Sequence, residues 1–489
     1  MLQDIKNTIK QSAIYGLSRI SFKFVAFLLF PLYSIYFSVD DYGIIVRGEI
    51  FWQLIQSSML YAIETAIIRW YTLIPEPQKK KSLIVSVFSF LLVLNILLLA
   101  IALIAPKLIS SLLFTTPDFG LLVQICLVVS MFETLVGLPL VILRIQEKAT
   151  KYSIIVILET LVSFGLQFYF ITSTSQKLNG IFISKAIASL LIFFILMPTL
   201  VRSINLKIDL KILKEVLIFS FPLMIASFVS FLFNSQDRFI LGYLSDSREV
   251  GLYGLGSNIA GILVFLLVSP FALAFPVLFW KKIDDGNAAR YFTKTMTYSF
   301  LAFVFGAMVL SLITPNFIKV FARNPDYWSA KSVVPILSFS RVLYGMQVIG
   351  FMSFYQHKKT SIVLLILVIS AIFNIILNLI LVPPFKMYGA SVSTFLSYFI
   401  STILIYRLSK RYYFIKWENY KLTISILISA LLVAPFYLFN IENLILSITL
   451  KTLAIIIFPF ILYIFHFYED IELVTVKNYL RKSKKFIIK

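Results

Sequence analysis

Cysteine and histidine are nearly absent from this sequence of 489 residues. The one cysteine, Cys126, lies inside an apolar run, so the chain cannot form an internal disulfide or a cysteine-based metal site. The two histidines, His357 and His466, fall at the ends of apolar runs. A multi-span acyltransferase would need a catalytic histidine within the membrane, so this pattern argues against that class of enzyme.

Acidic residues are also scarce, because 23 Asp and Glu stand against 44 Lys and Arg, and charged residues make up only 14% of the chain. In a soluble protein, a net charge of +21 would indicate nucleic-acid binding. Here 60% of the residues are hydrophobic and lie in uninterrupted runs, which is typical of a polytopic membrane protein. We therefore expect membrane lipids, and not nucleic acid, to contact the basic loops.

Two further signatures are missing. No glycine-rich phosphate loop ending in Lys-Ser or Lys-Thr occurs, so we expect no ATP hydrolysis by this chain and no bound cofactor. A driving force would then come from a coupling ion, H⁺ or Na⁺, or from downstream consumption of the substrate. The amino end has no short apolar core followed by a small-residue cleavage site, so we expect the first helix to remain as a membrane anchor.

What the sequence does contain is fourteen long apolar runs. A membrane-spanning helix needs about 20 predominantly apolar residues. By that measure helices are predicted near residues 10–37, 44–70, 82–105, 120–143, 152–171, 178–201, 215–241, 250–279, 291–314, 332–356, 358–382, 388–408, 421–440 and 444–468. Most of the 44 Lys and Arg residues stand in every second loop, beginning with the amino end. Because short basic loops stay in the cytoplasm, both chain ends are predicted to be cytoplasmic.

The runs form two sets of six followed by two more. We predict an all-α fold with an N-terminal six-helix lobe at 1–201, a cytoplasmic linker at 202–214, a second six-helix lobe at 215–410, two extra helices within 411–468 and a basic cytoplasmic tail at 469–489. The motifs Asp41-Tyr42-Gly43 and Glu249-Val250-Gly251 occupy equivalent places in the two sets. This equivalence indicates an internal repeat, and transporters often bind their substrates between such repeats.

The loop pattern leaves some basic residues unexplained. These are Arg19, Lys23, Arg47, Lys185, Arg238, Arg341 and Lys451. An ionisable side chain deep in a span costs at least ~2.5 kcal/mol, so it needs a partner, a wet cavity or a function. Arg19 and Lys23 lie four residues apart and therefore on one helix face, which should point into the bundle. Contact with an anionic substrate and pairing with acidic residues of neighbouring helices remain open alternatives.

Several segments carry a family resemblance. They are Asp41-Tyr42-Gly43, Arg144-Ile145-Gln146-Glu147-Lys148-Ala149 with Tyr152, Ser220-Phe221-Pro222-Leu223, Asp237-Arg238-Phe239-Ile240-Leu241-Gly242 and Val250-Gly251-Leu252-Tyr253. Together with the helix count, they resemble polysaccharide exporters of the multidrug/oligosaccharidyl-lipid/polysaccharide superfamily. The resemblance implies a flippase of the bacterial cytoplasmic (inner) membrane that moves undecaprenyl-pyrophosphate-linked oligosaccharide units through a cavity between two lobes, by alternating access. The product would be lipopolysaccharide O-antigen, capsule or exopolysaccharide, and a polysaccharide polymerase and a chain-length regulator are candidate partners.

A cationic cavity suits a pyrophosphate head group, because arginine offers a planar fork to paired phosphate oxygens and lysine a compact charge. Relatives that flip lipid-linked peptidoglycan precursor use basic residues of the first two helices. The resemblance therefore implies substrate contact for Arg19, Lys23 and Arg47. Lys185 and Arg341 stand alone in their spans and are further candidates for this cavity, with snorkelling to the membrane surface as the alternative.

The acidic residues within the spans supply the remaining candidates. Gate or ion-pair roles are predicted for Glu49, Glu64, Asp237 and Arg238, although Asp237 and Arg238 also fit a structural pair near an outer helix end. Glu133 and Glu159 are the deep acids of the first lobe. Such carboxylates can carry a coupling proton or hold a sodium ion, and simple pairing with a cation is the alternative.

Two other functions compete with the flippase. A multidrug extruder of the same superfamily would favour acidic residues for cationic drugs, whereas the charges embedded early in this chain are mainly basic. A membrane-embedded polysaccharide polymerase would be expected to have a large outer loop, and the longest outer loop here, 315–331, is short. We therefore predict a transporter and not an enzyme.

Overall fold

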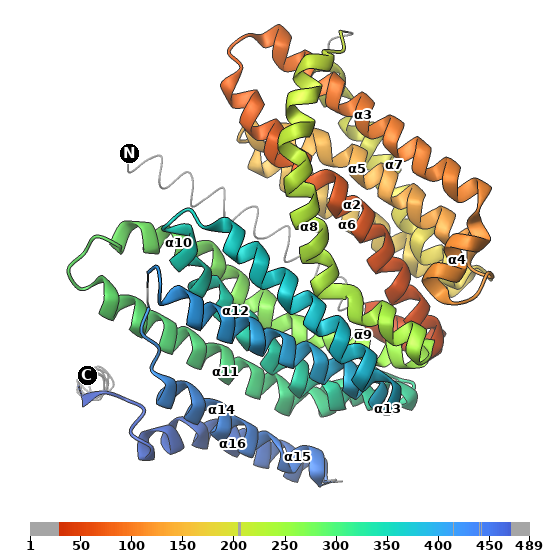
Figure 1. Cartoon of the computed structure of the whole chain (residues 1–489). Coiled ribbons are helices and arrows are strands. Elements are labelled where there is room, and N and C mark those ends of the chain that lie inside the picture. Colours follow the sequence, from red (N-terminus) through yellow and green to blue (C-terminus); the bar gives the residue numbers. More distant parts are fainter. Residues whose placement is uncertain (1–28, 204–206, 414, 440, 442, 471–489) are drawn as a thin grey trace, which may run out of the picture. The chain divides into compact units, whose positions relative to one another are not determined.

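The computed structural model describes residues 29–203, 207–413, 415–439, 441 and 443–470, which fold into helices joined by short loops (Figure 1). No strand occurs in these ranges. Eleven helical segments among them are long and apolar enough to cross a membrane. The prediction of an all-α polytopic membrane protein is therefore confirmed.

Contacts divide the chain into two compact units. Unit 1 comprises Met1–Gly254, Lys319–Trp328 and Ala371–Ala390, and unit 2 comprises Leu255–Ile318, Ser329–Ser370 and Ser391–Lys489. The lobe boundaries expected from the sequence, 1–201 and 215–410, stay a prediction.

Unit 1 is a bundle centred on α5. Its helices are α2 (Val39–Leu73), α3 (Pro77–Ile104), α4 (Pro106–Phe114), α5 (Gly120–Ile145), α6 (Ala149–Ser173), α7 (Lys177–Ser203), α8 (Leu210–Leu244) and the beginning of α9 (Ser247–Leu263). Helix α5 packs against α2, α3 and α7, while α6 packs against α7 and α8 runs along α2 (Figure 1). Ile67, Leu83 and Leu138 are fully buried where α2, α3 and α5 meet, so the apolar faces of three predicted spans form this core.

Helix α4 was not predicted from the sequence. Pro106 starts it, as proline favours the first turn of a helix, and Thr115 ends it in the left-handed region at φ 67°. Ser110 lies on its buried face, whereas Leu108 and Leu112 are exposed. Its nine residues are too few to span a bilayer, so a search for long apolar runs passes over it.

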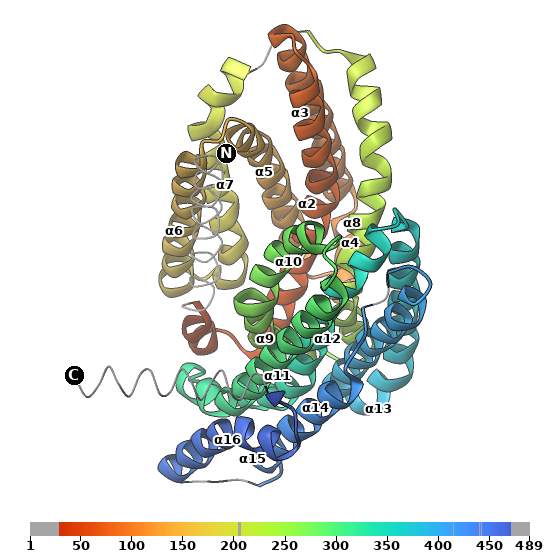
Figure 2. The ribbon, with the colours of Figure 1, turned by 90° about the vertical axis from the view of Figure 1, so that its left-hand side faces the viewer.

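Unit 2 contains most of the second set of helices and the two extra ones. Its elements are the end of α9 and then η1 (Val264–Val268), α10 (Ser269–Lys282), α11 (Ala288–Phe321), η2 (Pro325–Val333), α12 (Val334–Tyr355), α13 (Thr360–Ser409), α14 (Asn419–Val433), α15 (Pro435–Leu438) and α16 (Leu444–Ile464). The end of α11, the start of η2 and the middle of α13 belong to unit 1. Helices α14 and α16 pack together and lie beside α11 (Figures 1 and 2). The Tyr437 hydroxyl donates to the Ser311 carbonyl at 2.7 Å, and the ring centroids of Phe305 and Phe458 are 5.9 Å apart.

Two predicted spans are joined within α13. The helix continues to Ser409 but breaks at Lys386 (φ 48°, ψ −125°), just after Pro383 and Pro384. These bounds agree with the separate spans predicted at 358–382 and 388–408. A Cβ on Gly389 would lie 2.1 Å from the Leu381 carbonyl oxygen, so the tight break requires glycine there.

The break also shows a second trace of the internal repeat. Lys386-Met387-Tyr388-Gly389 in α13 matches Lys177-Leu178-Asn179-Gly180 at the start of α7 in its lysine and glycine. A Cβ added to Gly180 would meet the Phe170 side chain at 2.5 Å, whereas a Cβ added to Gly389 would meet the Leu381 backbone carbonyl.

Candidate functional site

A polar cluster lies inside unit 1, among α2, α5, α6 and α7. We call it the Lys185 cluster, and it consists of Trp52, Gln56, Glu133, Glu159, Lys185 and Ser189. Glu133 accepts a hydrogen bond from Gln56 Nε2 at 2.7 Å, and Glu159 accepts one from Ser189 Oγ at 2.8 Å. Lys185 Nζ lies 3.9 Å from the centre of the Trp52 ring, which is a cation–π contact.

Helical spacing explains how these residues come to face one another. Trp52 and Gln56 are four residues apart on α2, and Lys185 and Ser189 are four apart on α7, so each pair occupies one helix face. The two acids come from α5 and α6, the helices packed beside them. Lys185 interacts electrostatically with both carboxylates.

The charges of the cluster are unequal. Among the described residues of the cluster, two carboxylates and one ammonium group leave one negative charge in excess when all are ionised, and one bound proton or cation would neutralise it. Trp52 is 4% exposed, whereas Glu133, Glu159 and Lys185 retain intermediate exposure inside the bundle. The arrangement can therefore exchange a proton or meet a charged ligand. In the described part of the chain no three His, Cys, Asp or Glu side chains gather as a metal site requires.

Arg47 lies elsewhere in unit 1, away from these acids. Its side chain is 1% exposed and donates to Ser247 Oγ at 2.5 Å and to the Leu113 carbonyl at 3.4 Å. Its guanidinium carbon is 5.5 Å from the centre of the Phe114 ring. The structure thus shows Arg47 bonded among helix ends, and its predicted contact with substrate stays a prediction.

Arg341 is the candidate cation of unit 2. Its guanidinium donates to the Tyr398 hydroxyl and to Ser257 Oγ, both at 3.3 Å, and lies over the Tyr398 ring at 5.9 Å. Three helices, α9, α12 and α13, thereby bring a cation and two hydroxyl groups together. Long hydrogen bonds from a half-buried arginine are easily exchanged for bonds to a ligand, so Arg341 remains a candidate for substrate contact.

The predicted gate and ion-pair residues separate into different places within unit 1. Glu64 forms an ion pair with Arg144, in the last turn of α5, and Glu49 is half-buried on α2. Asp237 is 4% exposed and accepts a hydrogen bond from the Tyr253 hydroxyl. Arg238 donates to the Asn234 carbonyl at 3.3 Å and also lies over the Tyr253 ring.

Arg19 and Lys23 lie outside the described residues, so their predicted polar stripe stays a prediction. Sequence reasoning missed Trp52, Gln56 and Ser189, although a helical signal for them exists. Glu49, Trp52 and Gln56 recur at intervals of three and four, as one face of a helix does, and Ser189 follows Lys185 by four.

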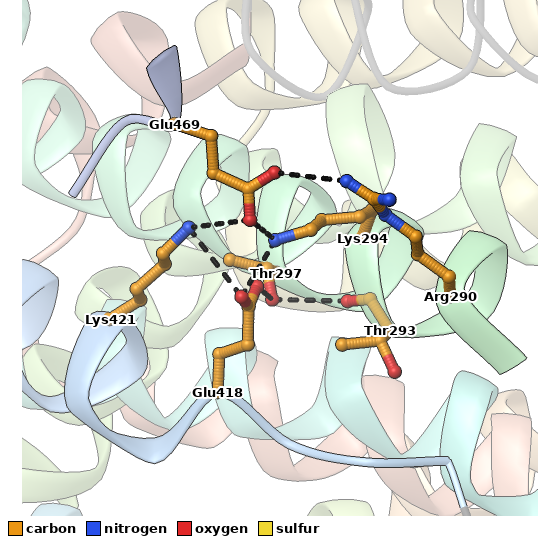
Figure 3. Close-up of polar contacts among 7 residues, drawn as sticks. All are labelled: Arg290, Thr293, Lys294, Thr297, Glu418, Lys421 and Glu469. Atoms are coloured by element: carbon orange, nitrogen blue, oxygen red, sulfur yellow. Dashed lines mark hydrogen bonds and ion pairs between the residues drawn. The ribbon is translucent and has the colours of Figure 1, made fainter. Parts of the chain in front are cut away.

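An ion network connects the extra helices to α11. Figure 3 shows Lys294 between Glu418 and Glu469, with Nζ at 2.7 Å from Glu418 Oε1 and bonded also to Glu469. Lys421 approaches the same two carboxylates at 3.5 and 3.7 Å, and Arg290 approaches Glu469 at 3.6 Å. The network joins the segments before α14 and after α16 to α11.

The network predicts a measurable acid sensitivity. Burial acts to raise the pKa of the Glu418 carboxyl, but hydrogen bonds from Lys294 and Thr297 outweigh it and the pKa is lowered. The hydrogen bond from Lys294 likewise lowers the pKa of Glu469. Groups with a depressed folded pKa stabilise the fold above their unfolded pKa, about 4.3, and lose that contribution as pH falls through the folded pKa.

We therefore expect the purified protein to lose thermal stability below about pH 4–5, and the Glu418→Gln and Glu469→Gln double variant to show a shallower loss. The measurement is the melting temperature in detergent across pH 3–7. Glu76→Gln is the matched control, because Glu76 pairs with Lys79 at 3.2 Å on the exposed surface, where an ion pair adds little. Identical acid curves for the double variant and the original protein would contradict the prediction.

Comparison of the fold defines the class of protein. The structure is similar to an inward-closed lipid II flippase MurJ, with a TM-score of 0.76 and 18% identity over 93% of this chain and 99% of that chain. It is also similar to an inward-facing multidrug resistance transporter of the MATE family, of the MOP superfamily, with a TM-score of 0.63 and 13% identity over 81% of this chain and 97% of that chain. At these identities the likeness shows the fold alone, an all-α bundle of membrane-spanning helices.

The sequence then gives the family. Residues 36–322 match the family described as polysaccharide biosynthesis protein, and the chain belongs to it. The resemblance drawn from the motifs is thereby confirmed. Among relatives, the probable low-salt glycan biosynthesis flippase Agl15 of Haloferax volcanii is 25% identical over 42% of this chain and 44% of its own. The capsular polysaccharide biosynthesis protein CapF of Staphylococcus aureus is 24% identical over 58% of this chain and 73% of its own.

The stretch aligned with this chain covers less than half of the length of two of these relatives. An uncharacterized membrane protein of Methanocaldococcus jannaschii is 29% identical over 40% of this chain and 38% of its own length.

Proposed function

We propose that this protein is a flippase that moves lipid-linked oligosaccharide units across the cytoplasmic membrane for the synthesis of a surface polysaccharide. The observation that carries the proposal is the Lys185 cluster, a lysine and two glutamates held inside a bundle of the polysaccharide biosynthesis family. Such groups are costly in a membrane and mark pathways of ions or polar substrates. The names of the relatives Agl15 and CapF support the same class of substrate.

The substrate head group is proposed to be a pyrophosphate on undecaprenol or a similar lipid. Arg341 in unit 2 supports this proposal, because its planar guanidinium offers hydrogen-bond donors in fixed directions. The predicted Arg19 and Lys23, which lie outside the described residues, would add two further cations. Lys185 supplies a cation beside two acids, and Glu133 and Glu159 are proposed to bind the coupling proton or sodium ion. The proposal includes an O-antigen or capsule unit as the cargo and an inner-membrane location with both chain ends in the cytoplasm. It also includes a polysaccharide polymerase and a chain-length regulator as partners.

Deletion of the gene tests the function directly. We expect lipid-linked oligosaccharide to accumulate on the cytoplasmic face of the membrane, because the step that moves it outward is lost. The measurement is labelling of the sugar in sealed inside-out and right-side-out vesicles from the deletion strain. Accumulation of unpolymerised units in the outer leaflet would instead indicate a polymerase, and unchanged polysaccharide with increased drug sensitivity would indicate a multidrug extruder, whose fold this chain shares.

A second test addresses the cationic site. The Arg19→Ala and Lys23→Ala double variant is expected to lose polysaccharide export without losing membrane abundance, because an anionic head group would lose its counter-charges. Arg47 is left in place, since its contacts are with helix ends. Export by the double variant at the original level would contradict a pyrophosphate site at the first helix.

A further inference from the structure

The two ends of α13 lie beside the end of α12 in unit 2. Val363 near the beginning of α13, Ile405 near its end and Phe354 of α12 are buried in one apolar cluster. A Cβ added to Gly350 of α12 would lie 2.3 Å from Ile405 Cγ2, so the two helices are in direct contact. The segments that follow α12 and α13 in the sequence are therefore neighbours in space.

This part of unit 2 is strongly basic. Its exposed cations, which we call the basic end, are Lys358, Lys359, Arg407, Lys410, Arg411 and Lys416. The sequence has no aspartate or glutamate between Asp326 and Glu418. Glu418 itself accepts hydrogen bonds at 2.7 Å from Lys294 and from Thr297 (Figure 3). The basic end therefore has no carboxylate in its own segments to neutralise it.

Other basic loops of the sequence do contain acids. Glu76 precedes Lys79 and pairs with it at 3.2 Å, and Asp285 follows Lys282 and pairs with it at 2.8 Å. Lysine and arginine set the orientation of a membrane protein, and acidic residues contribute little to it. The loop bias therefore explains the cations of the basic end but not its lack of acids. A binding site for an anion explains both, because a carboxylate there would repel the ligand.

Aromatic side chains indicate that the basic end lies at the membrane surface. The centre of the Tyr406 ring is 4.9 Å from that of Trp417 and 4.4 Å from Lys410 Nζ. The Tyr412 ring packs against Phe354, with ring centres 5.8 Å apart. Tyrosine and tryptophan collect at the level of the lipid head groups, where an apolar ring and a polar tip are both satisfied.

Exposed apolar side chains begin within two turns of the basic end. Leu364 and Leu365 of α13 are 41% and 53% exposed, and they follow Lys359 by five and six residues. At 1.5 Å per residue they lie about 7–9 Å further along the helix. A phospholipid has the same two parts in the same order, a charged phosphate at the surface and acyl chains below it. A soluble anion or an acidic protein would use only the charges.

We propose that the basic end binds an anionic phospholipid of the surrounding membrane, phosphatidylglycerol or cardiolipin. The phosphate group contacts the exposed lysines and arginines, and the acyl chains lie along Leu364 and Leu365. The bound lipid joins the segment after α12 to the segment after α13, because each contributes cations. The inference rests on charge and packing within unit 2 and does not depend on the proposed transport function.

Lipid binding to the purified full chain tests the site. The protein is titrated in neutral detergent with phosphatidylglycerol or phosphatidylcholine, and bound lipid is counted by native mass spectrometry. We expect phosphatidylglycerol to bind more tightly. The Lys358→Gln and Lys359→Gln double variant, and equally the Arg407→Gln and Arg411→Gln double variant, should lose about 10–30-fold in that affinity, because each basic residue near an anionic lipid surface contributes roughly fivefold.

The matched control is the Lys79→Gln and Lys148→Gln double variant. It also removes two exposed lysines, but they stand in unit 1, and Glu76 and Glu147 lie close to them in the sequence. It should keep the original affinity, as should Lys358→Arg with Lys359→Arg, which retains both charges. If one glutamine pair fails to fold, the other pair decides, since each removes two cations of the same site.

Two results would overturn the proposal. Equal affinity for phosphatidylglycerol in the original protein and the glutamine variants would remove the lipid site and favour a soluble acidic partner for these charges. Displacement of the bound lipid by an equal concentration of glycerophosphoglycerol would show that the head group suffices without acyl chains. A melting temperature that rises with phosphatidylglycerol in the original protein and the control, but not in the glutamine variants, would support the site independently.

Discussion

Replacing Lys185 by methionine is expected to abolish polysaccharide export and to destabilise unit 1. Lys185 interacts with Glu133 and Glu159, so its removal leaves two carboxylates inside the bundle without their cation. Removing one partner of a buried ionic group costs about 3–5 kcal/mol. The contact with the Trp52 ring is lost as well. The measurements are export in the host cell and the melting temperature of the purified protein.

A second substitution separates the two effects. Adding Glu159→Gln to Lys185→Met removes one of the unbalanced charges and keeps a hydrogen-bond acceptor for Ser189. Glu159→Gln alone is the reference for export, because Glu159 is itself a proposed site of the coupling ion. If Lys185 acts in transport, the double variant regains stability but exports less than Glu159→Gln; if Lys185 only holds helices together, stability returns and export equals that of Glu159→Gln. Lys282→Gln is the matched control, because Lys282 pairs with Asp285 on the exposed surface at 2.8 Å. Recovery of stability with export equal to that of Glu159→Gln would contradict a transport role for Lys185.

Replacing Arg341 by alanine is expected to lower export by about 10–100-fold, the loss that corresponds to one or two charge-assisted hydrogen bonds. Arg341→Lys keeps the charge but not the planar fork and should recover export only in part. Tyr398→Phe removes one acceptor of Arg341 and should have a small effect, because that bond is long at 3.3 Å.

Export and abundance are measured together for these variants. If Arg341 only packs the helices, Arg341→Ala and Tyr398→Phe should lower abundance in parallel and leave export per molecule unchanged. That outcome would remove Arg341 from the proposed site.

Much of the fold was predictable because hydropathy is a local property. The run at 120–143 became α5 at Gly120–Ile145, and the run at 444–468 became α16 at Leu444–Ile464. The break in α13 was predicted as a gap between spans, since Pro383 and Pro384 interrupt the apolar run. The π-helical turn η1 before Pro270 was not, because its sequence Val264–Val268 is as apolar as its neighbours.

The sequence predicted individual residues of the Lys185 cluster, but it did not predict that they lie together. Lys185, Glu133 and Glu159 each stood out as ionisable residues within apolar runs, which is a property of the sequence alone. They come from α7, α5 and α6, and the rotation of each helix about its axis decides whether they meet. Side-chain packing between helices sets that rotation, and the residues next to each charge in the sequence do not determine it.

The sequence by itself determined the class of the protein, the positions of most spans and the sign of the charge in each loop, because length, hydropathy and charge are counted along the chain. It also showed that Asp41-Tyr42-Gly43 and Glu249-Val250-Gly251 are equivalent. Only the tertiary structure decided that these two motifs cross at their glycines and that Arg47 bonds across the crossing. The approach of two backbones about 200 residues apart depends on how whole helices pack, which no local pattern records.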